Sequence, residues 1–243
     1  MTPHQLPAPP SRRIFSHAGY ELRVTLRNGE QLLLSLILPS MILVFLSTST
    51  LITVDAADRV QVITPGVFTL AVMSSAFTGQ AIATGFERRA GALRMFATTP
   101  LGRGGLLGGK VLGVVGMQVV QVIVLGAIAI ALGWEPAPLG IFITAGLMLL
   151  GTGAFTALGL LLAGTLRAEA VLAAANILWV LLMVGGGSIL PGPAWTSWLP
   201  SGALGDALRQ ALTAGTVDGV AIVVLTGWMV TLSGLTMRFF RWA

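Results

Sequence analysis

Six stretches of this sequence carry no charged residue and are each long enough to cross a lipid bilayer. They occupy residues 31–54, 60–86, 111–134, 136–166, 170–205 and 219–237. A helix rises about 1.5 Å per residue and the hydrocarbon core of a bilayer is about 30 Å thick, so about 20 apolar residues are needed to span it. The sequence therefore predicts an all-α, polytopic membrane protein with six transmembrane helices.

The composition indicates that lipid is the solvent for most of the surface. Hydrophobic residues make up 55% of the chain and charged residues only 9%, whereas soluble domains carry about 25% charged residues. So few charges cannot cover a surface that faces water. The chain contains no cysteine, which excludes iron–sulfur clusters, cysteine-bound zinc and thiol chemistry.

The lysine and arginine residues lie almost entirely on one side of the six predicted spans. Twelve of the fourteen fall there, namely Arg12, Arg13, Arg23, Arg27, Arg88, Arg89, Arg94, Arg103, Lys110, Arg167, Arg238 and Arg241. The other side carries only Arg59 and Arg209. The positive-inside rule makes the richer side cytoplasmic, so both chain ends are predicted to be inside. Because these residues are distributed as membrane anchors, the net charge of +5 does not indicate nucleic-acid binding.

Two segments precede the first span. Residues 1–13 are polar and rich in proline, without the apolar core of a signal peptide, and we predict a disordered cytoplasmic tail. Residues 14–30 carry an apolar stripe at helical spacing, formed by Phe15, Ala18, Leu22 and Leu26. This stripe predicts an amphipathic helix that lies along the cytoplasmic surface of the membrane.

The fifth uncharged run is too long for one helix and contains residues that break helices. Three glycines at residues 185–187 are followed by Pro191, Pro193 and Pro200, which cannot continue a membrane helix without losing backbone hydrogen bonds. We predict that the fifth helix ends near Gly187. Residues 188–212 are then an external segment that contains a short helix or re-enters the membrane.

Known chemical motifs are weak in this chain. Residues 104–110 match the G-x-x-x-x-G-K part of a phosphate-binding loop, but Val111 stands where that motif needs serine or threonine. We therefore predict a flexible entry into the third span instead of a nucleotide site. His4 and His17 lie near the N-terminus and no acidic pair lies inside a span, so no catalytic residue and no metal ligand is predicted. No span offers a group to bind a driving proton or sodium ion, so uphill transport would draw its energy from another protein.

The loop after the second span, at residues 86–99, is the largest cytoplasmic connection. It carries an apolar helical stripe beside two arginines, formed by Leu93, Phe96 and Ala97 next to Arg89 and Arg94. Thr99 and Pro100 would end the helix. A helix of this kind can rest on lipid or dock in the groove of a partner protein.

In this loop the sequence resembles the permease subunits of ABC-2 type exporters, which include the daunorubicin-type drug-resistance permeases. The matching motif reads Glu87-Arg88, Gly91, Leu93, Thr99-Pro100 and Gly109-Lys110. A second match follows the fifth span, where the proline-rich stretch from Leu190 leads to a short helix around Asp206 and Arg209. The sequence departs from the family pattern at Arg89 and Arg94, where acidic residues are common.

The resemblance implies a multi-pass permease of the bacterial plasma membrane, with residues 31–243 as its transmembrane domain. It implies pairing with a second copy or a sister permease, and docking of two ATPase subunits that bind ATP and Mg²⁺. This chain would bind lipid and a hydrophobic small molecule, but no cofactor of its own. The residues assigned to ATPase coupling are Phe86, Glu87, Arg88, Arg89, Gly91, Leu93, Arg94, Thr99 and Pro100.

The resemblance also places the first, second and fifth spans nearest the substrate path. The polar and polarisable residues of these spans are Ser47, Thr48, Ser74, Ser75, Thr78, Asn176, Trp179 and Met183. They can instead serve packing or bond to their own helices. A lining without fixed charge favours export of a hydrophobic or amphiphilic drug, antibiotic or lipid. Two alternatives stay open: a related permease for haem or for lipid or glycan precursors, and a membrane assembly protein without transport activity.

Overall fold

The computed structural model describes residues 8–49, 56–97 and 99–240, and every regular element in this part of the chain is helical. Six stretches are long and apolar enough to cross a membrane: Gly29–Thr48, Arg59–Arg89, Gly104–Ala131, Pro138–Thr165, Ala168–Gly185 and Gly219–Phe239. These correspond one to one with the six uncharged runs. The prediction of an all-α protein with six transmembrane helices is therefore confirmed.

Two of the spans are built from consecutive helical segments. The first consists of α2 (Gly29–Leu32), the π-helix η1 (Leu33–Ile37) and α3 (Leu38–Thr48). The second consists of α4 (Ala56–Val72), the π-helix η2 (Met73–Gly79) and α5 (Gln80–Arg89). The other four are α7 (Gly102–Ala131), α8 (Pro138–Thr165), α9 (Ala168–Gly185) and α11 (Gly219–Phe239).

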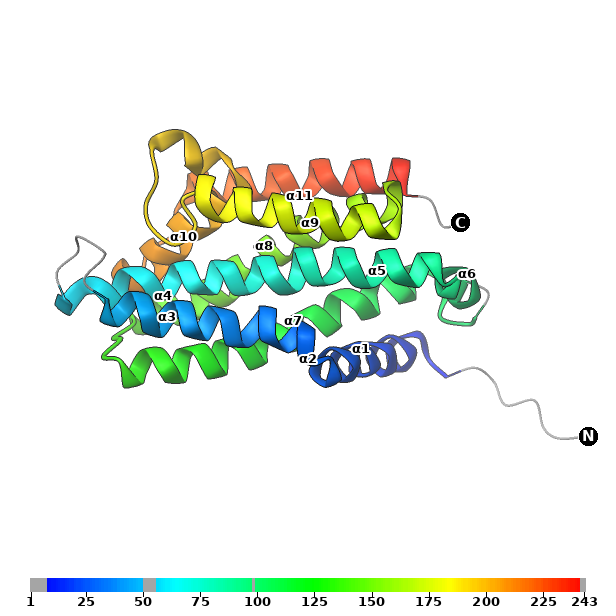
Figure 1. Cartoon of the computed structure of the whole chain (residues 1–243), viewed down its shortest axis with the longest axis horizontal. Coiled ribbons are helices and arrows are strands. Elements are labelled where there is room, and N and C mark those ends of the chain that lie inside the picture. The colour runs from blue at the N-terminus through cyan, green and yellow to red at the C-terminus, as the bar shows by residue number, and fades with distance from the viewer. Residues whose placement is uncertain (1–7, 50–55, 98, 241–243) are drawn as a thin grey trace, which may run out of the picture.

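The shorter helices lie at the two ends of the bundle. The helix α1 (Pro10–Arg27) and the helix α6 (Ala92–Ala97) lie at one end, where α11 also finishes (Figure 1). The 3₁₀ helix η3 (Ala194–Trp198) and the helix α10 (Pro200–Ala214) lie at the opposite end. This is the arrangement that a topology with both ends in the cytoplasm requires.

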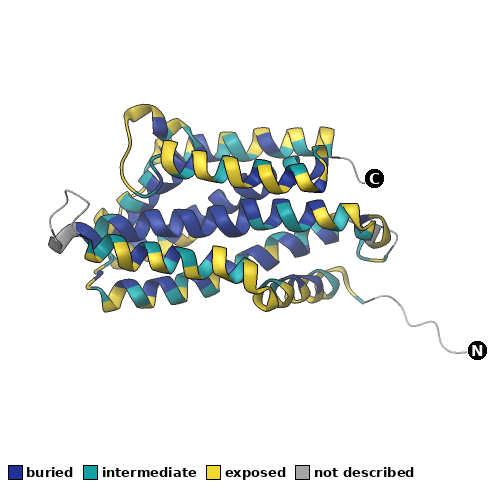
Figure 2. Cartoon of the chain, in the orientation of Figure 1, coloured by how far each residue is buried: buried dark blue, intermediate teal, exposed yellow. Residues whose placement is uncertain are grey.

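The second span forms the centre of the molecule. Ile63, Val67, Leu70 and Phe77 are fully buried, and Figure 2 shows α4 and much of α5 in the colour of buried residues. The neighbouring span α8 approaches closely at Gly159, where an added methyl group would lie 2.7 Å from the carbonyl oxygen of Phe77. Small residues permit such approaches, which supply the van der Waals packing that holds membrane helices together.

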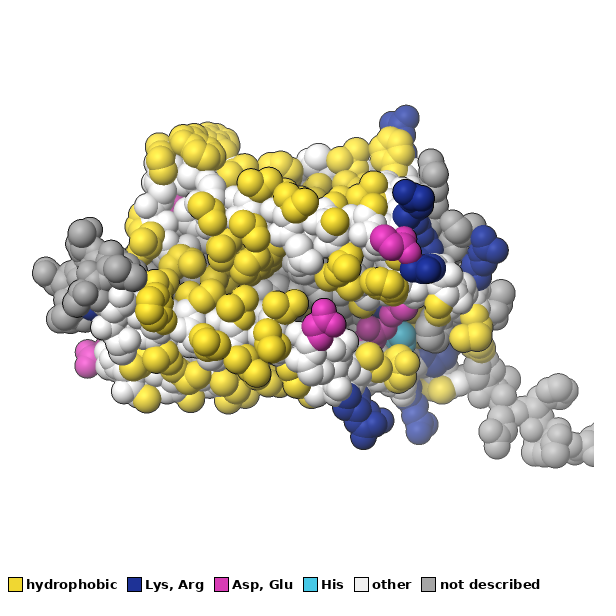
Figure 3. Space-filling model, in the orientation of Figure 1, with side chains coloured by type: hydrophobic (Ala, Val, Ile, Leu, Met, Phe, Trp, Pro, Cys, Tyr) yellow, Lys and Arg dark blue, Asp and Glu magenta, His cyan; other side chains and the backbone are white. Residues whose placement is uncertain are grey.

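The outer surface of the bundle is apolar. Large hydrophobic side chains such as Met41, Phe142, Val184 and Met237 are more than half exposed. Figure 3 shows a face with hydrophobic side chains over the middle of the bundle and with lysine and arginine gathered at the end near α6. The apolar middle of the bundle is therefore suited to contact with lipid hydrocarbon chains, and the basic end is suited to contact with water or lipid headgroups.

The segment after α9 folds back into the protein. The helix α9 ends at Gly185, close to the predicted end at Gly187. The following helix α10 buries Ala203, Leu204 and Leu208 completely. Arg209 holds the segment in place, because its guanidinium donates to the carbonyls of residues 187–189 and pairs with Asp206 at 2.7 Å. This arginine therefore supplies hydrogen-bond donors to carbonyls of the non-helical segment that follows α9.

The structure differs from two expectations, one for the predicted tail and one for the entry into the third span. Most of the predicted tail, residues 1–7, lies outside the described residues, and residues 10–13 belong to the first turn of α1. Within the predicted apolar stripe, Ala18 is buried against the protein and Phe15 is 67% exposed, so the placement of this helix on the membrane surface stays a prediction. The predicted flexible entry at residues 104–110 is wrong: these residues are helical and belong to α7.

Candidate functional site

The first part of the site is the contact between α1 and α7. Three glycines of α7, at residues 105, 109 and 113, follow one another at four-residue spacing and so lie on one face of the helix. That face meets Ile14, His17 and Glu21 of α1, and a methyl group at Gly113 would lie 2.7 Å from the Cβ atom of Glu21. Of the two glycines that define the apparent phosphate-binding motif, Gly109 thus serves close packing of the two helices, whereas a methyl group at Gly104 would meet nothing within 4 Å among the described atoms.

A buried cluster of charged groups lies at this contact. The ammonium group of Lys110 is 3.0 Å from Oε1 of Glu21 and 2.8 Å from the carboxylate of Glu87. His17 Nε2 lies 3.2 Å from the same oxygen of Glu21, and Lys110 is only 1% exposed. We call these four residues the Lys110 cluster. It joins α1, the end of the second span and the third span.

The electrostatics of the Lys110 cluster favour an ionised Glu21. Burial alone raises the pKa of this carboxyl, but the hydrogen bond from His17 and the positive charge of Lys110 outweigh burial and lower the pKa. Two carboxylates then surround one buried ammonium. Such a cluster is costly to break, because removal of one member leaves the others charged and desolvated.

The two residues that follow Glu87 connect α5 to a different part of the bundle. Arg88 donates a hydrogen bond to the carbonyl of Leu166, which ends α8. Arg89 pairs with Glu169 in the first turn of α9. The sequence Glu87-Arg88-Arg89 therefore ties the end of the second span to the helices on both of its sides.

The remaining predicted coupling residues lie in and around α6. The predicted coupling helix begins too early, because α5 continues to Arg89 and a turn at Gly91, with φ of +74°, separates it from α6. Leu93 is 1% exposed and anchors α6 to the protein. Arg94 and Pro100 are exposed, Thr99 is half-buried, and Phe86 borders the cavity described next.

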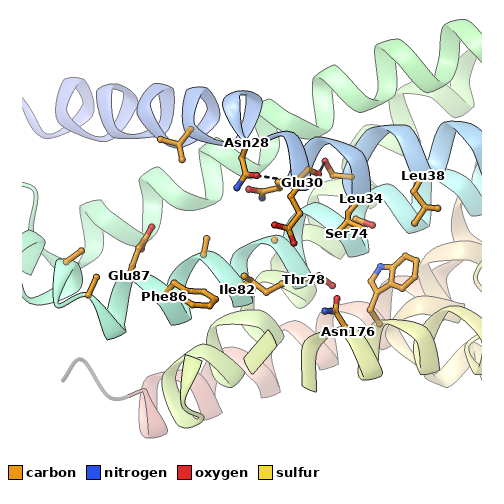
Figure 4. Close-up of a pocket in the computed structure, with 18 of the residues that line it drawn as sticks. Asn28, Glu30, Leu34, Leu38, Ser74, Thr78, Ile82, Phe86, Glu87 and Asn176 are labelled. Atoms are coloured by element: carbon orange, nitrogen blue, oxygen red, sulfur yellow. Dashed lines mark hydrogen bonds between the residues drawn. The ribbon is translucent and has the colours of Figure 1, made fainter. Parts of the chain in front are cut away.

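A cavity of about 760 Å³ lies between the first, second and fifth spans and the end of α1. Figure 4 shows Glu30 and Leu34 on one side, Thr78, Ile82 and Phe86 on another, and Asn176 on the fifth span. Of the eight residues predicted for the path, Ser74, Thr78, Asn176 and Trp179 line this cavity. The others are not among its described lining residues, which holds for Ser47, Thr48, Ser75 and Met183. Thr48 and Ser75 donate to carbonyls of their own helices instead.

The two π-helices border this cavity. A π-turn accommodates an extra residue and leaves backbone groups without regular partners, and such turns are frequent at functional sites. Here the side chain of Gln121 on α7 enters between them, because its amide nitrogen lies 2.6 Å from the carbonyl oxygen of Ser35 in η1. The same nitrogen lies 3.4 Å from the carbonyl oxygen of Ala71, just before η2.

Sequence reasoning missed His17, Glu21, Lys110 and Glu30 as members of a site. His17 and Glu21 are four residues apart and so share one helical face, which is the signal that would have paired them. Lys110 was counted as a membrane anchor and Glu30 as the end of the interfacial helix. Only the tertiary arrangement brings Lys110 to Glu21 and Glu30 to the cavity.

The comparison with known proteins gives one family. A model of the family described as ABC-2 type transporter matches residues 13–214, which run from α1 to the end of α10. Among curated proteins, no sequence matches the chain. The matched region contains the Lys110 cluster and all the described residues that line the cavity.

Proposed function

Because this chain belongs to the ABC-2 type transporter family, in which it is the permease component, we propose that it forms the path by which a hydrophobic or amphiphilic molecule leaves the cell. Two separate ATPase subunits, which bind ATP and Mg²⁺, supply the energy. A second copy of this chain or a sister permease completes the path. The cavity between the first, second and fifth spans is the observation that carries this proposal.

The cavity has the character of a small-molecule site. Its walls are largely apolar, with Leu34, Ile82 and Trp179 among them, and a few polar groups such as Asn176 and Thr78 project into it. Sites for drug-sized ligands have this combination of apolar walls and few polar groups, in volumes of about 300–1,000 Å³. Its position near the basic end of the bundle suits entry from the inner leaflet or the cytoplasm.

The contacts at the end of α5 support the proposed transmission of energy. In our proposal the ATPase meets α6, where Arg94 and Met95 are exposed. Movement of α6 shifts the end of α5, which Glu87 joins to Lys110 and Arg88 joins to the end of α8. Buried charged contacts transmit such a displacement as a movement of whole helices, because packed interfaces do not deform gradually.

The proposal is tested by affinity purification of the full chain from the cells that produce it and by identification of any ATPase that co-purifies. We expect a stoichiometric complex in which a transported substrate stimulates ATP hydrolysis. Arg94→Glu should weaken recovery of the ATPase by about tenfold, since a reversed charge opposes docking. Arg238→Glu is the control, because Arg238 is exposed near the same end but lies on α11. Failure of any ATPase to bind would exclude transport and favour an assembly role.

A further inference from the structure

The cavity carries negative charge, and no cationic side chain is among the described residues that line it. The expectation of a lining without fixed charge is therefore wrong. Glu30 and Glu87 are the charged residues among the described residues that line it, and none of those residues is lysine, arginine or histidine. Glu87 lies 2.8 Å from the ammonium group of Lys110, which it shares with Glu21. Among the described residues, Glu30 forms no ion pair, and its carboxylate points from α2 into the cavity (Figure 4).

Glu30 lies where the cavity meets the end of the first span. It belongs to the first turn of that span and is exposed. The opposite wall holds a hydroxyl with an unmet hydrogen-bonding capacity, because Thr78 is only 7% exposed and its Oγ1 atom has no partner among the described residues. The indole N–H of Trp179 also lacks one there. These groups are placed to meet a polar part of a ligand.

We propose that this cavity binds an amphiphilic organic cation, with the Glu30 carboxylate as the counter-charge. The inference rests on the proposed function and narrows its substrate class. A protonated amine beside Glu30 neutralises the carboxylate, whereas an anion would be repelled and a neutral molecule would leave the charge partly desolvated. Trp179 and Phe86 take the apolar body, and the indole face also attracts a cation.

Direct binding to the full chain in dodecyl maltoside, an uncharged detergent, tests this inference. The probes are tetraphenylphosphonium and tetraphenylborate, which have the same shape and opposite charge. After subtraction of binding to empty micelles, we expect about tenfold tighter binding of the cation, and about a tenfold loss in Glu30→Gln. Glu135→Gln is the matched control, because Glu135 is exposed at the other end of the bundle. Equal affinity for both ions, or an unchanged Glu30→Gln variant, would overturn the inference.

Charge reversal separates a lost charge from a damaged fold. Glu30→Lys should weaken binding of tetraphenylphosphonium and strengthen binding of tetraphenylborate, a gain that a misfolded protein cannot give. If the variant binds neither ion while its thermal unfolding matches that of the parent, Glu30 does not act as a counter-charge. Because this assay contains no ATPase, loss of cation binding leaves the proposed transport function intact with another cargo.

An ammonium group also occurs on membrane lipids. A competition experiment with lipids therefore shows whether the cavity recognises a lipid headgroup or a soluble amphiphile. Phosphatidylethanolamine carries an ammonium group and phosphatidylglycerol does not. Displacement of the bound cation by phosphatidylethanolamine alone would assign the site to a lipid headgroup, and displacement by neither lipid would assign it to a soluble amphiphile. Equal displacement by both lipids would show that charge is not recognised and would overturn the inference.

Discussion

Lys110 is the buried charged residue that connects three helices at the basic end of the bundle. It is 1% exposed and lies within 3.0 Å of Glu21 on α1 and 2.8 Å of Glu87 on α5. The nearby pair of Arg89 and Glu169 has the same opposite charges, but both side chains are more than 60% exposed. Water screens an exposed pair, whereas it does not reach Lys110.

Lys110→Met should therefore destabilise the protein strongly. Removal of one partner from a buried ion pair costs about 3–5 kcal/mol, because the other charges remain desolvated. Arg89→Gln should have little effect on stability, because water and salt screen an exposed ion pair. Unfolding in detergent, followed by tryptophan fluorescence, measures both. Equal losses in the two variants would show that the Lys110 cluster is not a buried electrostatic unit.

A compensating variant distinguishes lost charge balance from lost packing. When Glu21→Gln and Glu87→Gln are added to Lys110→Met, no uncompensated charge remains in the Lys110 cluster. Stability should then recover in part relative to Lys110→Met alone. A further loss in the triple variant would instead point to packing of the lysine side chain as its main contribution.

At the scale of elements, α1 is held by a glycine face of α7. The short distances at this face leave no room for a side chain, whereas a methyl group at Gly126, farther along α7, would meet nothing within 4 Å among the described atoms. A comparison of Gly113, which lies on this face, with Gly126 therefore separates the effect of close packing from the general effect of replacing a glycine in a helix.

Gly113→Ala should loosen α1, with Gly126→Ala as its control on the same helix. The added methyl group at Gly113 would meet the Cβ atom of Glu21, and overpacking of this kind costs about 1–3 kcal/mol. Trypsin cleavage after Arg23 and Arg27, on α1, measures how often this helix leaves its place. We expect faster cleavage in Gly113→Ala alone. The same rate in both variants would contradict the assigned packing.

At the scale of the whole molecule, the two ends of the bundle differ in charge and in structure. One end carries α1, α6 and most of the basic residues, and the other carries η3 and α10 (Figures 1 and 3). Because the chain has no cysteine, a single introduced thiol reports the side of the membrane on which it lies.

Trp195→Cys should react with a membrane-impermeant maleimide on intact cells, and Arg94→Cys should react only after the cells are permeabilised. Trp195 is 58% exposed and Arg94 is exposed, so access from water decides the outcome. Reaction of both thiols in intact cells would contradict the assigned orientation and with it the cytoplasmic docking of an ATPase at α6.

The sequence determined the features that depend on local composition. The six spans follow from the length of uncharged runs, and the end of α9 follows from glycines and prolines that no membrane helix continues through. The side of the membrane on which each loop lies is likewise predicted from the number of lysine and arginine residues in that loop. Such properties need no knowledge of which helices are neighbours.

Only the tertiary structure decided which residues meet. From the sequence, the glycine-rich stretch was predicted to be flexible, whereas in the structure α1 packs on residues 105–113. Lys110 was predicted to be a membrane anchor, whereas in the structure Glu21 and Glu87 surround its ammonium group. The sequence places Glu30 at the end of an interfacial helix, and only the positions of the second and fifth spans show that it borders a cavity. The physical reason is that burial, ion pairing and cavity shape depend on residues that are far apart in the sequence. Glu30 and Asn176, for example, are 146 positions apart and line the same cavity.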